Sequence, residues 1–339
     1  MRLLFITQKI DERDGPLGFV HGWVKAFASR YEKVTVICLE QGASTLPEAT
    51  AVLSLGKETH RSRLQYVVRF YKYIVRLRRD YDVVLVHMNQ EYVLLGAILW
   101  KMLGKRVGFW YNHTHGGFRT KVAMMLSDVV FHTSPYAFTA CASHSRRMPA
   151  GIDVEQFVDE DSNRDETEVL FIGRIAPIKG LHVLAKAVGL LSHDTPLHLT
   201  VYGAALPEDA QYAAGILSEA PSRSLFNPAV PNVQTPPLYR KAGIFVNLTP
   251  AGNYDKTVLE AMACGALPVV SSPAFNDAVP GDSRFVENNP ASLASALEAI
   301  YRLPAEEKAS RRRKNRAYVC ERHSLEVLTE ALEHNLMRL

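Results

Sequence analysis

The chain has 339 residues, 47% of them hydrophobic and 22% charged, with four cysteines and a formal net charge of +4. These values exclude a disordered chain and leave room for two domains of roughly 100 to 200 residues each. The cysteines are far apart and form no CxxC pair, which argues against a zinc site or a disulfide framework and favours a reducing, cytoplasmic location.

The first half of the chain alternates apolar strand patterns with helical patterns. Strands are predicted over residues 2–7, 34–39, 82–87, 107–111 and 128–134. Continuous apolar strands separated by helices are typical of a parallel sheet that is covered on both faces. The opening residues turn polar after Thr7, and the longest apolar run, YVLLGAILW, stops at Lys101, so we expect neither a signal peptide nor a membrane span.

Two loops in this half are candidate ligand contacts. The loop DGPLG, after the first strand, contains Gly15 and Gly18, which permit close approach of the backbone to a ligand. The stretch GKRVGFWYNHTHGG places His113 and His115 just after a strand. Such a pair is a fragment of a metal site, but no nearby cysteine or carboxylate completes it. Structural histidines are the alternative, and no metal is expected.

Residues 60–79, HRSRLQYVVRFYKYIVRLRR, predict a basic helix with several aromatic side chains. We expect its apolar residues to pack inward, namely Leu64, Val67, Val68, Phe70, Tyr71 and Ile74. The alternative is that its basic, aromatic face contacts anionic lipid headgroups. Residues 1–157 carry 21 basic and 13 acidic residues, whereas the rest of the chain carries 18 and 22. Nucleic acid is not expected as a partner, because no RNP-like or helix-turn-helix pattern accompanies the charges.

The second half repeats the alternation, which predicts an α/β fold with two doubly wound domains. Its strands are predicted over residues 168–173, 197–203, 243–248 and 267–272. The acidic stretch DVEQFVDEDSNRDETE is interpreted as an exposed linker. We expect domains over 1–157 and 158–320, which face one another across a central cleft, and a C-terminal helix over 321–339 that packs back on the first domain.

The stretch FIGRIAPIKGLHVLAKAV, residues 171–188, places Arg174 and Lys179 between a strand and a helix. Two cations beside the amides and the positive dipole of a helix N-terminus indicate a diphosphate site. The alternative is that both are solvated loop residues.

A second stretch, NLTPAGNYDKTVLEAMACGALPVVSS, follows a later strand. Asp255 or Thr257 can cap the helix that begins there, and Glu260 lies one turn inside it. A carboxylate at that place can accept hydrogen bonds from ribose hydroxyls. Alternatively, Glu260 only complements the helix dipole.

Together, GRIAPIKG and LEAMACGALPVVSS resemble the retaining glycosyltransferases of family 4 (glycosyl transferases group 1), which have the two-domain architecture called GT-B. PNVQTPPLYRKAGIFVNL is also similar to the family's segment before its acidic motif. The resemblance covers the second domain through specific motifs and the first domain through its layout. It implies a transferase whose donor is a nucleoside-diphosphate sugar.

The resemblance also implies roles for single residues. Arg174 and Lys179 would bind the donor diphosphate, and Glu260 would bind the nucleotide ribose. Lys256 and Thr257 match positions whose backbone amides meet the phosphates. Gly15 and Gly18 belong to the first domain, the acceptor-side domain of this architecture, and we expect their loop to contact the donor.

Two further positions complete the implied site. His113 matches a histidine that lies near the donor sugar in family members. The acidic motif of the family is usually Glu, seven residues, Glu, but its first position here is Gly252. The usual contact to the donor-sugar hydroxyls is therefore missing, and Asp255 is the candidate substitute.

We therefore predict a metal-independent, retaining transferase that moves a sugar from a UDP- or GDP-sugar to an acceptor hydroxyl. The expected acceptor is a glycan or a lipid-linked molecule, with peripheral contact to an anionic membrane, and no cofactor beyond the donor is expected. Two alternatives stay open: a degenerate, donor-binding partner subunit, and a nucleotide-sugar epimerase of the same fold. A nicotinamide dehydrogenase is disfavoured, because the first strand-turn-helix lacks GxGxxG.

Overall fold

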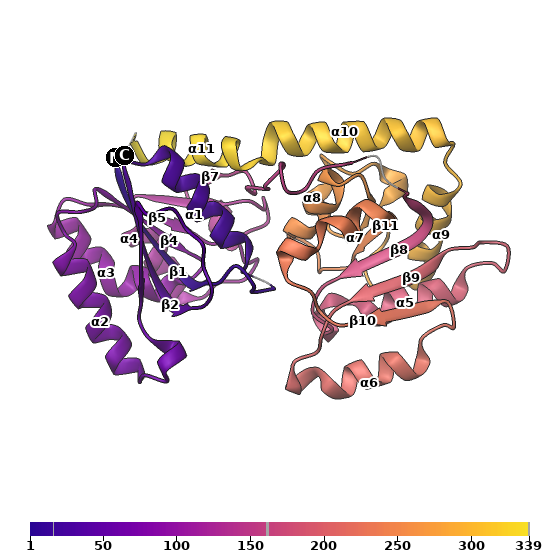
Figure 1. Ribbon diagram of the computed structural model, residues 1–339, viewed down its shortest axis with the longest axis horizontal. Coiled ribbons are helices and arrows are strands. Elements are labelled where there is room, and N and C mark those ends of the chain that lie inside the picture. The colour runs from indigo at the N-terminus through magenta and orange to yellow at the C-terminus, as the bar shows by residue number, and fades with distance from the viewer. Residues whose placement is uncertain (16, 161–162, 338–339) are drawn as a thin grey trace. The chain divides into compact units, whose positions relative to one another are not determined.

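The computed structural model describes residues 1–15, 17–160 and 163–337, and the chain divides into two α/β units (Figure 1). Unit 1 comprises Met1–Gly151 and Leu325–Leu339, and unit 2 comprises Ile152–Ser324. Three parts of the expected segments lie outside the described residues: position 16 of the DGPLG loop, positions 161 and 162 of the acidic linker, and positions 338 and 339 of the last helix.

Unit 1 is built on a parallel sheet with the strand order β3-β2-β1-β4-β5-β6-β7. Its described strands are β1 (Arg2–Ile10), β2 (Lys33–Gln41), β3 (Thr50–Ser54), β4 (Val83–His87), β5 (Arg106–Trp110), β6 (Val129–His132) and β7 (Ser145–Arg147). Side chains of β1 alternate between two cores, with Leu3 and Phe5 in one and Leu4 and Ile6 in the other. Burial on both faces explains why the strands appear in the sequence as continuous apolar runs.

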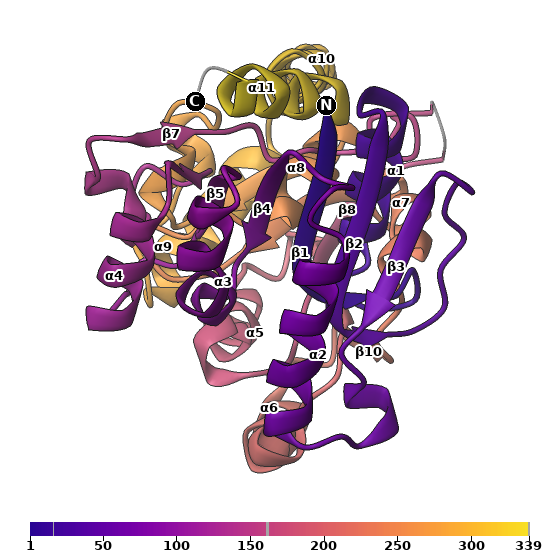
Figure 2. The same cartoon turned by 90° about the vertical axis from the view of Figure 1, so that its left-hand side faces the viewer.

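Helices cover both faces of this sheet. They are α1 (Phe19–Arg30), α2 (Arg63–Arg76), α3 (Gln90–Met102), α4 (Phe118–Leu126) and α11 (Leu325–Met337). Helices α1 and α11 pack in the core that contains Leu3 and Phe5, whereas α2, α3 and α4 pack in the core that contains Leu4 and Ile6. Figure 2 shows the second group in front of the sheet.

The helix expected over residues 60–79 forms as α2, but its packing differs from the expectation. It begins at a capping box, in which the side chains of Ser62 and Gln65 each accept a hydrogen bond from the other's backbone N–H. Phe70 and Ile74 are buried, as expected. Leu64, Val68 and Tyr71 are exposed and do not pack inward, because they lie on a different side of the helix from the two buried residues.

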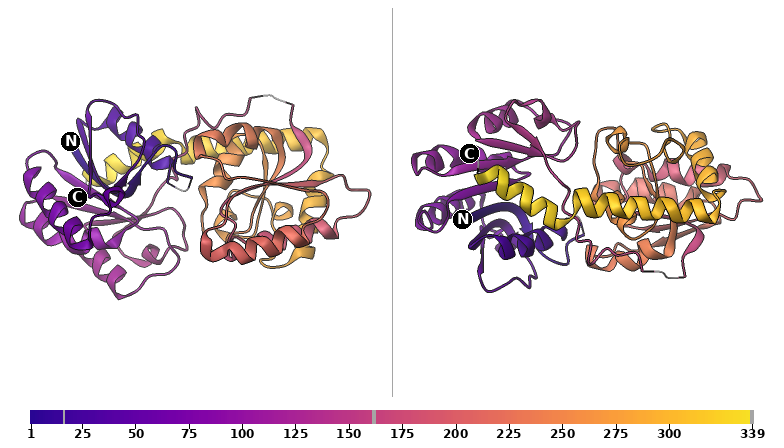
Figure 3. Two further views of the ribbon diagram at one scale, coloured as in Figure 1. Left: turned by 60° about the horizontal axis from the view of Figure 1, so that its bottom comes forward. Right: turned by 90° about the horizontal axis from the view of Figure 1, so that it is seen from above.

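The last helix, α11, packs on unit 1, as Figure 3 shows in yellow. Leu328, Leu332 and Leu336 recur every four residues and are fully buried, so they form one apolar stripe. The contact with β5 is close: a Cβ on Gly108 would lie 3.0 Å from a methyl carbon of Leu336. This stripe explains why a segment so late in the sequence belongs to the first unit.

Unit 2 is built on a second parallel sheet, with the strand order β10-β9-β8-β11-β12. Its described strands are β8 (Asp165–Ile172), β9 (His198–Tyr202), β10 (Ser224–Asn227), β11 (Ala242–Asn247) and β12 (Leu267–Val270). Its helices are α5 (Leu181–Leu190), α6 (Ala210–Glu219), α7 (Pro236–Lys241), α8 (Lys256–Ala263), α9 (Pro290–Tyr301) and α10 (Ala305–His323). The two doubly wound α/β domains predicted from the sequence are thus confirmed. Within the described ranges, no helix combines the length and the hydropathy that crossing a bilayer requires.

The first unit boundary falls at Gly151, earlier than the expected position after residue 157. Phe157 belongs to unit 2, because its ring packs on Tyr239 and its carbonyl accepts a hydrogen bond from Arg316. The second boundary follows Ser324 rather than residue 320, because α10 continues to His323. The acidic stretch is not a linker throughout, since β8 begins within it.

Candidate functional site

The cations expected in unit 2 lie near the carboxyl ends of β8 and β11. These neighbouring strands mark the point at which the strand order of the sheet reverses, where ligands bind in open parallel sheets. The loops after the two strands touch each other: Gly180 has a φ of 66°, and a Cβ on this residue would lie 3.0 Å from the Cβ of Leu248. Both the backbone conformation and the close approach therefore favour glycine at the start of α5.

Lys179 and Asp255 join the two loops in one polar cluster. The Lys179 Nζ lies 2.9 Å from Oδ2 of Asp255 and 3.3 Å from Oγ1 of Thr249. The same carboxylate oxygen accepts a hydrogen bond from Nδ2 of Asn247 at 3.1 Å and another from the Thr249 hydroxyl. Burial acts to raise the pKa of Asp255, but the charge of Lys179 and these hydrogen bonds outweigh it and hold the pKa below its ordinary value.

Asp255 occupies the N-cap position of α8, yet its side chain does not cap the helix. The carboxylate turns to Lys179 instead, so it satisfies none of the amides in the first helical turn. Lys256 and Thr257, the residues expected to offer amides, form that turn and are half-buried. An uncapped helix N-terminus beside a lysine is suited to bind an anion.

Arg174 lies in the loop after β8, where its side chain is exposed. It forms no hydrogen bond or ion pair with any residue that the structure describes. The two expected cations therefore differ: Lys179 is held by Asp255, whereas the guanidinium of Arg174 has no such anchor.

Glu260 is buried one turn into α8, with only 3% of its surface exposed. Its Oε1 accepts a hydrogen bond from Nδ2 of Asn232 at 3.1 Å, and its Oε2 accepts one from the Tyr239 hydroxyl at 3.3 Å. Burial raises the pKa of Glu260, although the bond from Asn232 and the charge of Lys256 act in the opposite direction. Burial also lowers the pKa of Lys256. The charge of each side chain favours ionisation of the other, whereas burial disfavours it for both.

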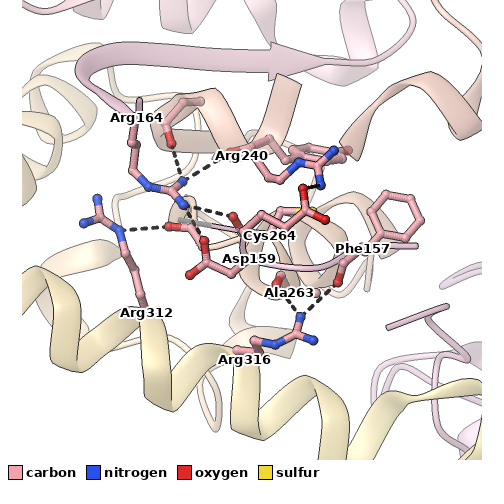
Figure 4. Close-up of polar contacts among 12 residues, drawn as sticks. Phe157, Asp159, Arg164, Arg240, Ala263, Cys264, Arg312 and Arg316 are labelled. Carbon is pink, nitrogen blue, oxygen red and sulfur yellow. Dashed lines mark hydrogen bonds and ion pairs between the residues drawn. The ribbon is translucent and has the colours of Figure 1, made fainter. Parts of the chain in front are cut away.

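Arginines hold the opposite end of α8 (Figure 4). Three of them donate to carbonyls at and just after the last residue of the helix: Arg316 to Ala263 at 2.8 Å, Arg164 to Cys264 at 3.2 Å and Arg312 to Gly265 at 2.9 Å. Cations at a helix C-terminus satisfy orphan carbonyls and stabilise the helix dipole. Helix α8 is thus anchored at the end remote from Asp255.

The expected residues of unit 1 lie in separate loops of that unit. His113 follows β5, and its exposed ring packs edge-on against Tyr111 at 5.1 Å between centroids. Desolvation lowers the pKa of His113. His115 is also exposed, and the described residues contain no group of three His, Cys, Asp or Glu side chains arranged to hold a metal ion.

The two glycines after β1 lie before and at the start of α1. Gly15 is exposed, and a Cβ on it would meet no atom within 4 Å. Gly18 is the N-cap of α1, with a φ of −55° that any residue can adopt. The packing of Gly15 does not require glycine, and neither does the backbone conformation of Gly18.

Comparison with known proteins relates this geometry to a family. Residues 166–302 match the family of glycosyl transferases group 1. This range contains the Lys179–Asp255 cluster and Glu260. A D-inositol 3-phosphate glycosyltransferase of Segniliparus rotundus is 31% identical over 182 residues, which are 47% of this chain and 40% of that protein. The chain thus aligns with about two fifths of the length of this relative.

Solved structures resemble the whole chain. HepE of Anabaena, in complex with UDP, has a TM-score of 0.80 and 16% identity, with all of both chains covered. Sucrose-phosphate synthase of Thermosynechococcus elongatus has a TM-score of 0.79 and 16% identity, over 100% of this chain and 98% of that one. At such identities the likeness concerns the fold alone. The fold is that of the GT-B glycosyltransferases, as the sequence motifs predicted.

Four polar residues that contact the predicted ones were not predicted from the sequence. They are Asn232, Tyr239, Asn247 and Thr249, which hold the carboxylates of Glu260 and Asp255. Asn247 and Thr249 carry a usable signal, because polar residues at the carboxyl end of an apolar parallel strand face the ligand side of the sheet. Asn232 carries none, since it comes from a 3-10 turn (Asn232–Gln234) before α7.

Proposed function

We propose that the chain is a retaining GT-B glycosyltransferase that transfers a sugar from a nucleoside-diphosphate sugar to an acceptor hydroxyl. The observation that carries this proposal is the position of Lys179, beside the uncapped N-terminus of α8, at the point where the strand order reverses. The match to glycosyl transferases group 1 over residues 166–302 supports it, because every residue of this cluster lies in the matched range.

In the proposed reaction, Arg174 and Lys179 bind the diphosphate of the donor together with the first amides of α8, from Lys256 and Thr257. Departure of the diphosphate builds negative charge on its oxygens, which fixed cations and helix amides stabilise most as the bond breaks. Because protein groups supply this positive charge, we propose that transfer needs no metal ion. Undiminished turnover in EDTA is expected, and loss of turnover that Mg²⁺ or Mn²⁺ restores would contradict this part of the proposal.

Asp255 is also proposed to contact the donor sugar. The diphosphate competes with its carboxylate for Lys179, so donor binding releases Asp255 to accept a hydrogen bond from a hydroxyl of the donor sugar. Asp255 then replaces the glutamate that the family has at the position of Gly252. Gly252 itself has a φ of 90°, a backbone conformation in which a glutamate would be strained, so the substitution matches the path of this loop.

Glu260 is proposed to accept hydrogen bonds from the ribose of the donor. Its two oxygens already accept from Asn232 and Tyr239, and these bonds fix the orientation of the carboxylate. Each oxygen keeps capacity for a further hydrogen bond. Ribose hydroxyls would supply that bond and would offset the cost of ionising a buried carboxylate.

His113 is proposed to lie near the donor sugar, and the loop with Gly15 and Gly18 is proposed to approach the ligand from unit 1. Desolvation lowers the pKa of His113 and so favours the neutral ring, in which one ring nitrogen can accept a hydrogen bond from a sugar hydroxyl. The proposed acceptor is a glycan or a lipid-linked molecule. The name of the Segniliparus relative adds phosphorylated polyols to the acceptors that should be tested.

Thermal unfolding with a panel of UDP- and GDP-sugars tests the donor class. A donor at 100 times its dissociation constant should stabilise the protein by about 2.7 kcal/mol, and UDP-sugars come first because HepE was solved with UDP. Donors that bind are then incubated with candidate acceptors, and the anomeric configuration of the product is read by NMR. Donor binding without turnover would favour a degenerate subunit, free altered sugar without acceptor would favour an epimerase, and no stabilisation by any donor would overturn the proposal.

A further inference from the structure

The outer surface of α2, α3 and α4 exposes large apolar side chains. On α2, Leu64, Val68, Tyr71 and Val75 recur at intervals of four, three and four residues, so they form one stripe along the helix. Leu64 is 73% exposed and Val68 is 60% exposed. This stripe is separate from Phe70 and Ile74, which pack on the sheet.

The apolar surface continues onto the neighbouring helices. The Tyr71 hydroxyl donates to the backbone carbonyl of Leu95 at 2.7 Å, so the stripe borders α3. There Ile98 and Met102, one turn apart, are 63% and 80% exposed, and on α4 Phe118 and Met125 are exposed to a similar degree. Figure 2 shows the three helices on the same side of unit 1. We call this surface of α2, α3 and α4 the outer helix face.

The outer helix face is also strongly basic. The three helices contain seven Lys and Arg residues and one acidic residue, Glu91, which is paired with Arg119. Two of the seven are engaged elsewhere, since Lys101 is paired with Asp128 and Arg69 donates to backbone carbonyls of the segment after β3 and of its last residue. Within the described part of the chain, Arg63, Lys72 and Arg76 of α2 form no ion pair. The basic residues of α10 are different, since Arg311, for example, is paired with both Asp282 and Glu307.

We propose that the outer helix face docks on a membrane surface rich in anionic lipid. Unpaired cations near such a surface contribute about 1 kcal/mol each, and exposed Leu, Val, Ile, Met and Phe side chains insert at the boundary between headgroups and acyl chains. The inference does not depend on the proposed transferase activity. It concerns unit 1 alone, whereas the donor cluster lies in unit 2.

The combination of charge and apolar area selects this partner over two others. A nucleic acid would bind the cations through its phosphates, but it would leave Leu64, Val68 and Met102 in water. A second copy of the chain, paired through the same face, would bring the two sets of cations together, and their repulsion opposes association. An anionic lipid surface offers negative charge and an apolar layer at once.

Co-sedimentation of the full chain with vesicles tests the proposal. Vesicles of phosphatidylcholine with about one third phosphatidylglycerol are compared with pure phosphatidylcholine, at low and high salt. We expect binding to the anionic vesicles that weakens at high salt. The triple variant Arg63→Gln, Lys72→Gln, Arg76→Gln should bind roughly 100-fold more weakly, as about 1 kcal/mol for each cation implies. The double variant Leu64→Ser, Val68→Ser should also bind more weakly.

A matched control uses an exposed apolar residue of unit 2. Leu217→Ser, on α6, should bind anionic vesicles as the wild type does, and circular dichroism should show that all variants are folded. The proposal is overturned if the wild type does not sediment with anionic vesicles at low salt, or if the variants of α2 bind as well as Leu217→Ser. The face would instead be assigned to self-association if light scattering showed a dimer for the wild type and a monomer only for Leu64→Ser, Val68→Ser. The face would be assigned to nucleic acid if duplex DNA displaced the wild type from the vesicles and Leu64→Ser, Val68→Ser still bound that DNA.

Discussion

Each unit has a lysine near the carboxyl end of its first strand, but the two lysines have opposite surroundings. The Nζ of Lys9 lies 2.8 Å from a carboxylate oxygen of Asp14 and 3.3 Å from those of Asp11 and Glu40. Within the described residues, Lys179 has one carboxylate neighbour, Asp255, and Arg174 has none. Lys9 is the penultimate residue of β1, whereas Lys179 lies between β8 and α5. At both places the local carboxylates decide what the lysine can bind.

This difference explains why an anion site is proposed in one unit only. The hydrogen bonds from Lys9 to its carboxylates, with that to Asp14 the largest influence, raise the pKa of this lysine. Its surroundings carry an excess of negative charge that would repel a diphosphate. In unit 2, Lys179 pairs with one carboxylate and lies beside a helix N-terminus, and Arg174 pairs with no carboxylate of the described residues. We therefore expect a lysine near the carboxyl end of a strand to indicate a phosphate site only where the surrounding carboxylates do not outnumber the cations.

The largest expected effect is on turnover. Lys179→Ala and Arg174→Ala should each lower the transfer rate by roughly 10² to 10³, because each removes a fixed charge from the departing diphosphate. Arg174 is exposed in a loop, so its replacement should change the unfolding temperature little. Lys179→Ala should lower the unfolding temperature, because Asp255 loses its ion pair. The measurement is initial-rate kinetics with the donor identified by thermal unfolding, and Lys186→Ala, on the exposed side of α5, is the control. Near-normal transfer rates in both variants would contradict the proposal that these two residues bind the diphosphate.

Whether a strand could be predicted from the sequence depended on where it lies in its sheet. The central strands are buried on both faces and appear as apolar runs, and all of them were predicted. Three short strands were missed: β3, β7 and β10, which lie at sheet edges. An edge strand buries less surface, so residues such as SRR in β7 carry no apolar signal.

Residues of the candidate site could be predicted where they lie close to one another in the sequence. The position of Arg174 and Lys179 between a strand and a helix could be predicted, because strand, loop and helix follow one another in the sequence. The pair of Lys179 with Asp255 could not, since it joins loops that are 76 residues apart and depends on the register of two strands. The exposed stripe of α2 was also mispredicted, because spacing reveals an apolar side of a helix but not what covers it.

A second prediction concerns Lys9, for which we expect a loss of stability without a loss of donor binding. Lys9→Met removes the cation that three carboxylates share, and the remaining repulsion should lower the free energy of unfolding by about 2 kcal/mol. The dissociation constant of UDP should stay within about twofold of the wild type, since the change is in the other unit. Chemical denaturation and calorimetric titration measure the two quantities. A UDP affinity at least tenfold lower would mean that unit 1 shares in diphosphate binding.

A third prediction separates binding from stability at Glu260. Glu260→Gln should weaken UDP-sugar binding about tenfold, because a neutral amide accepts hydrogen bonds from ribose less strongly than a carboxylate does. The variant should nevertheless be at least as stable as the wild type at pH 8. The raised pKa of Glu260 means that the folded state binds this proton more tightly than the unfolded state, so wild-type stability falls as pH rises above the ordinary carboxyl pKa.

Glutamine removes that dependence. The stability difference between Glu260→Gln and the wild type should therefore grow in favour of the variant between about pH 4 and pH 8. Denaturation curves at several pH values test this. Unchanged UDP-sugar affinity would argue against the ribose contact, whereas a variant that loses stability at every pH would show that the hydrogen bonds from Asn232 and Tyr239 need the charged acceptor.

The smallest expected effect comes from Asp255, whose removal should make unit 2 a better diphosphate site. Asp255→Asn frees Lys179 from its carboxylate, so UDP should bind about threefold more tightly at pH 7, by roughly 0.7 kcal/mol. UDP-sugar should gain less than UDP, because the proposed hydrogen bond to the donor sugar is weakened. Calorimetric titration of both ligands gives this comparison, and tenfold weaker UDP binding would mean that Asp255 positions Lys179 for the ligand and does not compete with it.

The same substitution should lower stability, with a pH dependence that identifies the ion pair. The folded-state pKa of Asp255 lies below its ordinary value, so the stabilisation is complete above the unfolded pKa of about 3.9 and is lost as pH falls through the lower folded value. Wild type and Asp255→Asn should therefore differ by about 1 to 3 kcal/mol at pH 7 and converge below about pH 4. A constant difference down to pH 2 would indicate that the hydrogen bonds of Asn247 and Thr249, rather than the charge of Asp255, stabilise the loop. In that case Lys179 would already be available to a diphosphate, and the contrast with Lys9 would be larger than the structure implies.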